Sequence, residues 1–250
     1  MSGHSKWAGI KHKKGAIDAK RGKIFTRLIR EITVAAKSGG GNVDNNVRLR
    51  KAIEQAKEAN MPQDNIKKAT LRGTGELPGV TYEETVYEGY GPGGVAVLVE
   101  VTTDNKNRTT SELRKTFSNS AGNLGENGSV AWMFSKKGSI TVEKSKYSNE
   151  DELMSISLEL GAEDFQADED NFEIITSPEN FEKIKQELEK KNIPIMDAEV
   201  TMIPKTYIKL TGKEADQMIS LMNALEDSDD VTNVSANFDI DKEILEKAGV

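Results

Sequence analysis

Charge is spread very unevenly along this 250-residue chain, and that limits what the chain can fold into. Residues 1–75 hold 17 Lys and Arg against 6 Asp and Glu, a net charge of +11. Residues 76–250 hold 17 against 35, a net charge of −18, so the overall −7 conceals two oppositely charged parts. The sign changes at 74–79, where Gly75, Pro78 and Gly79 are typical of a linker. We therefore expect a basic module joined to an acidic body.

The basic part begins with an arm and a helix that separates charge from apolar residues. Over 18–37 the apolar residues recur with the period of an α-helix, and most Lys and Arg fall opposite them. A basic helix face is the electrostatic footprint of a phosphate backbone, although a solvated surface is the plainer explanation. Few acidic residues neutralise this face, and Trp7 in the arm can stack on a base or a sugar. The candidate nucleic-acid contacts are Lys6, Trp7, Lys11, His12, Lys13, Lys14, Lys20, Arg21, Lys23, Arg27, Arg30, Arg48, Arg50 and Lys51.

Two more short helices are expected before the linker. Asp44 is the predicted N-cap of the second helix, which runs to the Pro62 region. The third begins near Pro62 and ends near Gly73, with Ile66 and Ala69 directed inward. Three short helices with brief loops predict a small bundle with a thin, Ala-rich core.

The acidic part alternates strand and helix patterns. Strands are expected at 82–90 and 94–102, joined by a Gly-rich turn that lacks the Lys-Ser/Thr pair of a phosphate-binding loop. A helix at 107–120 and a buried strand at 129–134 (SVAWMF) follow. From 139 to 203 the order is strand, helix, two strands, helix, strand, which is the split βαβ of a ferredoxin-like unit.

The tail predicts a strand at 206–210, a helix at 214–225 and a strand at 231–238. Neither this tail nor 82–134 is complete alone, so we expect both to form one discontinuous domain, with the strands at 206–210 and 231–238 in the same sheet as those of 82–134. Two consecutive domains with an unpaired tail are the alternative, but strand edges would be exposed. The expected fold is α+β and multidomain, with a three-helix domain (1–75), a discontinuous α/β domain (80–135 plus 205–240) and a ferredoxin-like domain (138–204) inserted in it.

Side chains for catalysis are sparse. The chain has no cysteine, and its two histidines, His4 and His12, lie in the basic arm, where lysines oppose a metal cation. The acidic clusters fall at helix starts and turns, not in predicted strands, and no GxSxG elbow occurs. We expect no enzyme activity, catalytic residue, metal, cofactor or small-molecule substrate. No signal peptide or membrane span is predicted, so a cytoplasmic monomer is expected.

Four segments together resemble the YebC family, which includes mitochondrial translational activators of cytochrome c oxidase. They are MSGHSKWAGIKHKK (1–14), KRGKIFTRLIREI (20–32), NVRLRKAIEQAKEANMPQDNI (46–66) and GSVAWMF (128–134). Gly9 stands where the family pattern has Asn, so no side-chain contact is expected there. The resemblance implies three domains, the third inserted in the second, and no enzyme activity.

The resemblance also implies a function in gene expression. Some family members are described as DNA-binding transcriptional regulators, which is the interpretation adopted for this chain. Others are described as ribosome-associated factors that relieve stalls such as those at proline runs, which would make rRNA and tRNA the partners. Two other classes stay open: a metal-dependent nuclease, and a protein-interaction module whose acidic domains bind basic protein segments. The acidic body can equally serve to repel nucleic acid and confine it to the basic module.

Overall fold

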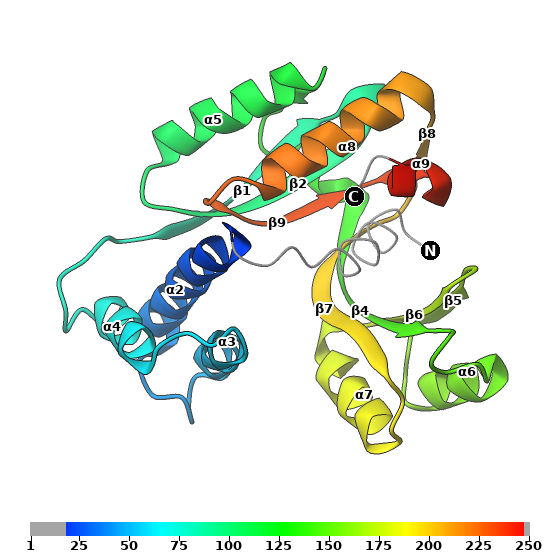
Figure 1. Ribbon diagram of the computed structural model, residues 1–250, viewed down its shortest axis with the longest axis horizontal. Helices are drawn as coiled ribbons and strands as arrows, with labels where there is room; N and C mark the ends of the chain where they lie inside the picture. Colours follow the sequence, from blue (N-terminus) through cyan, green and yellow to red (C-terminus); the bar gives the residue numbers. More distant parts are fainter. Residues whose placement is uncertain (1–18, 248–250) are drawn as a thin grey trace.

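The basic part of the chain is a three-helix bundle. A computed structural model describes residues 19–247 of the chain, with the side chains of 22–245 (Figure 1). The helices are α2 (Ala19–Gly39), α3 (Val47–Glu58) and α4 (Gln63–Thr74). Small residues let α2 and α4 approach closely: a Cβ added at Gly73 would lie 2.4 Å from the carbonyl oxygen of Thr33. The buried core is Ile32, Ala35, Ala36, Leu49, Ala52, Ala56, Met61, Ile66 and Ala69.

The N-cap of α3 is Asn46 and not Asp44, so that prediction is wrong. The Asn46 Oδ1 atom accepts the backbone N–H of Leu49 at 3.0 Å. Its Nδ2 atom donates to the carbonyls of Ala35 and Gly40, both at 2.8 Å. Only an amide can make this set of bonds, because a carboxylate has no hydrogen to donate. Asn46 therefore caps one helix and also ties it to the end of α2.

The second domain is built on a sheet whose strand order is β3-β1-β2-β9. The β1–β2 hairpin turns through the short 3-10 helix η1 (Pro92–Gly94), as the Gly-rich turn predicts. β1 lies between β2 and β3, so β2, α5 and β3 form a split βαβ crossover. Helices α5 and α8 cover one face of the sheet (Figure 1). The elements are β1 (Glu83–Tyr90), β2 (Ala96–Thr103), α5 (Lys106–Asn119), β3 (Asn123–Leu124), α8 (Gly212–Glu226) and β9 (Val231–Ala236).

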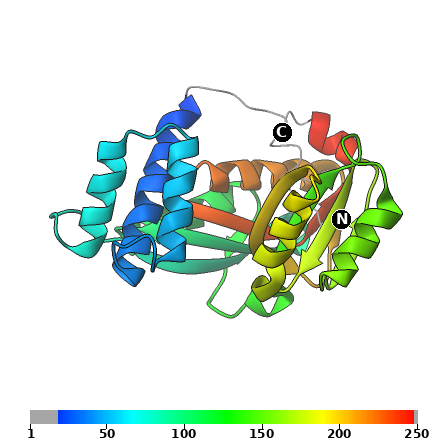
Figure 2. The ribbon, with the colours of Figure 1, turned by 90° about the horizontal axis from the view of Figure 1, so that it is seen from below.

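The inserted domain is ferredoxin-like. Its sheet order is β5-β6-β4-β7, and every neighbouring pair is antiparallel. Its buried core joins both helices to the sheet through residues such as Leu153, Phe172 and Ile184. Figure 2 shows this domain and the helical bundle at opposite ends of the molecule. The elements are β4 (Phe134–Glu143), α6 (Glu150–Glu159), β5 (Asp164–Ala167), β6 (Asn171–Thr176), α7 (Pro178–Lys190) and β7 (Ile195–Pro204).

The tail returns to the second domain, as an insertion requires. β9 pairs antiparallel with β2, and Leu210, Met218 and Leu225 enter the same core as Val97 and Val99. β8 (Ile208–Leu210) is not in that sheet, contrary to the prediction. It pairs in parallel with β10 (Phe238–Ile240) and is followed by α8; a short helix α9 (Lys242–Lys247) comes after β10. The domain limits predicted from the sequence (1–75, 80–135 plus 205–240, and 138–204) stay predictions.

The strand predicted at 231–238 is divided at Asn237. The buried Asn237 Oδ1 atom accepts the N–H of Ala96 at 2.7 Å. The carbonyl of Asn237 accepts the N–H of Ile208 at 2.8 Å. One residue thus ends β9 and joins it to the β8–β10 pair.

The prediction of a buried strand at 129–134 is also wrong. Residues Ala131–Met133 form a 3-10 turn (η2), and β4 begins only at Phe134. The carboxylate of Glu88 accepts the backbone N–H groups of Gly128, Val130 and Ala131, at 2.6 to 2.8 Å. Those donors are then not available to a sheet ladder. Over residues 19–247, no helix is long and apolar enough to cross a bilayer.

Replacing Asn46 with Ala should lower the free energy of unfolding by about 2 to 4 kcal/mol, because a cap bond and two side-chain donors are lost. Asp44→Ala is the matched control, since its exposed side chain lies two residues away and does not cap the helix. Urea unfolding of both variants measures the difference. Equal losses for the two variants would contradict the assignment of the cap.

Candidate nucleic-acid interface

The predicted nucleic-acid contacts fall into two groups. Lys6, Trp7, Lys11, His12, Lys13 and Lys14 lie outside the described residues, and Lys20 and Arg21 are placed in α2 without their side chains. For these eight, the predicted contact stays a prediction. The other six are Lys23, Arg27, Arg30, Arg48, Arg50 and Lys51.

The basic face of α2 lies against a loop of the second domain, residues 226–230 (EDSDD), which we call the acidic loop. Lys23 pairs with Asp227 at 2.9 Å. Arg27 donates to the carbonyls of Glu226 and, at 3.2 Å, Ser228. The loop follows the C-terminus of α8, whose free carbonyls carry partial negative charge and favour cations. The face that the sequence offers to phosphate is thus occupied by protein acceptors.

Arg30 makes a largely buried contact, with a side chain only 12% exposed. Its Nη1 atom donates to Asp230 Oδ1 at 2.8 Å and to the carbonyl of Asp229. The guanidinium also lies 5.5 Å from the centre of the ring of Tyr82, a residue at the start of the second domain. The Nε atoms of Arg27 and Arg30 are buried without an acceptor among the described residues. The contact is extensive, but its hydrogen bonding is incomplete.

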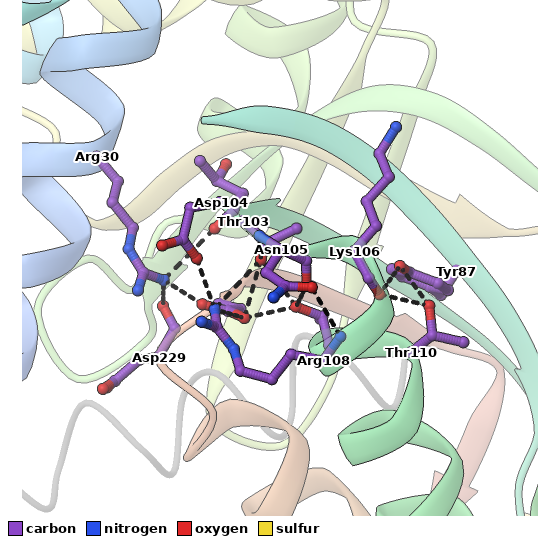
Figure 3. Close-up of polar contacts among 12 residues, drawn as sticks. Arg30, Tyr87, Thr103, Asp104, Asn105, Lys106, Arg108, Thr110 and Asp229 are labelled. Atoms are coloured by element: carbon purple, nitrogen blue, oxygen red, sulfur yellow. Dashed lines mark hydrogen bonds and ion pairs between the residues drawn. The ribbon is translucent and has the colours of Figure 1, made fainter. Parts of the chain in front are cut away.

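Asp230 is the centre of the contact. Figure 3 shows the side chains of Arg30, Thr103 and Arg108 pointing toward one another. The side chain of Asp230 is 5% exposed, and its Oδ2 atom accepts from Thr109 at 2.6 Å and Arg108 at 2.9 Å. Burial raises the pKa of Asp230, but the bonds from Thr109 and Arg108 and the charge of Arg30 outweigh burial, so the pKa lies below its ordinary value. One ionised carboxylate therefore joins α2, α5, the end of β2 and the acidic loop.

A cavity of about 550 Å³ opens beside Asp230. Its charged lining combines two arginines, Arg30 and Arg108, with five carboxylates. Both arginines already bond to Asp230, so the free lining is negative and does not suit a phosphate. Within the described residues, no group of three His, Cys, Asp or Glu could hold a metal ion. The carboxylates are Asp104, Glu112, Asp227, Asp229 and Asp230.

The basic residues of α3 are also largely paired. Arg48 binds Glu31 at 2.7 Å and Glu84 at 2.5 Å, and these bonds raise its pKa above the ordinary value. Lys51 pairs with Glu182 on α7 of the inserted domain. Arg50 is exposed, and its hydrogen bond to the carbonyl of Asp44 is long, at 3.4 Å. Of the six, Arg27 and Arg50 have no ion pair in the described part of the chain, and Arg27 is held by the backbone carbonyls of the acidic loop.

A different basic surface is open, and the sequence interpretation missed it. Lys67, Lys68 and Arg72 on α4 are exposed and form no ion pair within residues 22–245. We call these three residues the α4 basic face. Lys68 and Arg72 are four apart, so they lie on the same side of the helix, and both are exposed while Ile66 and Ala69 are buried. That spacing is visible in the sequence and could have identified the face.

Comparison with known proteins gives a consistent result over nearly the whole chain. Residues 5–76 match the family model described as "TACO1/YebC protein N-terminal domain", and residues 82–238 match "TACO1/YebC second and third domain". A relative from Endomicrobium trichonymphae is 61% identical over 249 residues, covering 99% of each chain. One from Dictyoglomus turgidum is 58% identical over 246 residues, covering 98% of this chain and 99% of the relative. Both are named "Probable transcriptional regulatory protein".

One solved structure is also similar. It is the crystal structure of a conserved hypothetical protein from Aquifex aeolicus, with 51% sequence identity and a TM-score of 0.82. The match covers 94% of this chain and 97% of that one. The similarity therefore extends over all three domains.

Replacing Asp230 with Asn should destabilise the protein by about 3 kcal/mol at neutral pH, because the largely buried Arg30 and the more exposed Arg108 both lose their charged partner. The folded-state pKa of Asp230 lies below its ordinary 3.8, so its stabilising effect is present above that pH and is lost as pH falls through the folded value. The difference between wild type and Asp230→Asn should therefore shrink in acid. Urea unfolding at pH 7 and near pH 3 tests this, with the exposed Asp216→Asn on α8 as control. A deficit independent of pH would contradict the ionic role.

Proposed function

Since the chain belongs to the TACO1/YebC family, we propose that it regulates gene expression by binding nucleic acid through its basic N-terminal domain. Its relatives are named as transcriptional regulatory proteins, not as enzymes. The observation that carries the proposal is the charge division at the linker, +11 before it and −18 after it. Phosphate contact is sequence-independent and depends mainly on such positive charge.

The phosphate-binding surface in this proposal consists of the α4 basic face, Arg50 and the basic arm. Lys67, Lys68 and Arg72 have no carboxylate partner in the described part of the chain, so phosphates meet no competitor there. Lys23, Arg27 and Arg30 instead hold the helical domain on the acidic loop. A nucleic acid that reached those three would have to displace five acceptors of the acidic loop first. In the proposal these three residues position the helical domain on the second domain and do not contact nucleic acid.

The acidic domains complete the proposal by restricting where nucleic acid can lie. Their net charge repels a phosphate backbone, and the repulsion acts over roughly 8 to 10 Å at physiological salt. Most phosphate contacts are therefore made by the helical domain in this proposal. The target is DNA in a transcriptional regulator; in the alternative, a ribosome-associated factor, the same surface contacts rRNA and tRNA.

Lys68→Ala and Arg72→Ala should each weaken binding to all sequences alike. Each lost phosphate contact should flatten the slope of log K against log salt by about 0.7 to 0.9. Lys13→Ala in the arm should act in the same way. The matched control is Lys183→Ala, which removes an exposed lysine from α7 in the acidic part.

Titration of labelled duplex DNA and of structured rRNA fragments, at several salt concentrations, measures these slopes and compares the two targets. Tighter binding to duplex DNA supports the transcriptional role, and tighter binding to rRNA supports the ribosomal one. Binding that is independent of salt, or equally weakened by Lys183→Ala, would refute the proposed surface.

A further inference from the structure

Trp132 is unusually exposed for a tryptophan, which has the largest side chain of all residue types. It is 67% exposed, the highest value among the large hydrophobic side chains that the structure describes as exposed. The buried Val130 and Phe134 on either side of it pack with Ala96 and Leu98 on the sheet of the second domain. The turn is therefore anchored in the core, while the indole ring between the two anchors faces solvent.

The turn that carries Trp132 is held rigidly. The buried carboxylate of Glu88 accepts three backbone N–H groups of residues 128–131, and these bonds outweigh burial and lower its pKa. The hydroxyl of Tyr90 donates to the carbonyl of Ser129 at 3.0 Å, and the Trp132 Nε1 atom donates to the same carbonyl at 3.1 Å. The ring orientation is thereby fixed before any ligand arrives, which lowers the entropic cost of binding.

Two lysines without an ion pair lie in the segments next to Trp132, although this part of the chain is acidic overall. The Lys205 Nζ atom donates to the carbonyl of Trp132 at 2.8 Å, and the Lys205 backbone N–H donates to Met133 at 2.9 Å. Lys136 is exposed on β4, two residues beyond Phe134. Neither lysine forms an ion pair among residues 22–245. An aromatic face with unpaired cations beside it suits a strand that alternates bases and phosphates.

We propose that Trp132 stacks on an unpaired base of a single-stranded nucleic acid, with Lys205 and Lys136 contacting neighbouring phosphates. The inference rests on the proposed function and adds a second contact point on the acidic body. Duplex bases are already stacked and offer no free face, so the site selects looped or single-stranded segments. A base in this position adds a local contact beyond the non-specific phosphate contacts of the helical domain.

The experiment uses the full chain with Trp7→Phe, which leaves Trp132 as the sole tryptophan. An oligouridylate of about 12 nucleotides, within the usual range of single-strand site sizes, should quench its fluorescence on binding. In the wild-type background, Trp132→Ala should weaken oligouridylate binding by about 5- to 100-fold, and Trp132→Phe by less, because a ring remains. Lys205→Ala should weaken it and flatten its salt slope by about one contact. Affinity for duplex DNA should be unchanged in both Trp132 variants.

Leu158→Ala is the matched control, because Leu158 is also apolar and exposed (51%) but lies on α6 of the inserted domain. Circular dichroism and melting should be the same for Trp132→Ala and wild type, since the ring is not in the core. If wild type binds with salt dependence but Trp132→Ala binds equally well, the inference is wrong and the proposed function stands. If wild type binds no nucleic acid at all, both are wrong. If oligouridylate leaves the Trp132 fluorescence unchanged but a protein fraction freed of RNA changes it, the partner is a protein and the stacking proposal is overturned.

Discussion

The position of the helical domain on the second domain depends on one buried carboxylate, that of Asp230. It accepts hydrogen bonds from Arg30 on α2 and from Arg108 and Thr109 on α5, and its own backbone belongs to the loop after α8. Burying a charge is costly unless partners replace the lost water, and here four donors do so. The helical domain has little core of its own to compensate for losing this contact, since its centre is mostly Ala with a few larger residues. Its position on the second domain therefore rests largely on these polar contacts.

The opposite charges of the two parts attract each other within the molecule. Arg27, Arg30 and Lys23 meet the acidic loop, Arg48 meets Glu84, and Lys51 meets Glu182. The helical domain is thus tied electrostatically to both of the other domains. The α4 basic face forms no ion pair within residues 22–245, so its charge stays available for the external partner proposed above.

Much of the fold could be predicted from the sequence because the patterns that set it are local. Helical periodicity identified α2 to α4, and the order of strands and helices identified the ferredoxin-like insertion. The errors arose where a distant side chain decides the local structure. Glu88 takes up the N–H groups that a strand at 129–134 would need, from 40 residues earlier. Likewise, nothing near Arg30 in the sequence reveals an acceptor 200 residues away, so the basic face of α2 was interpreted as open.

That separation in sequence has a consequence for the protein during its own synthesis. A chain emerges from the ribosome N-terminus first, and early domains fold before later ones exist. The acceptors of Arg27 and Arg30 lie in residues 226–230, about 200 residues later in the chain. Until those residues emerge, the acidic loop is not available to the basic face of α2, which is then exposed next to the ribosome's own RNA. Emergence and folding of the acidic loop convert that face from a free surface into a contact between domains.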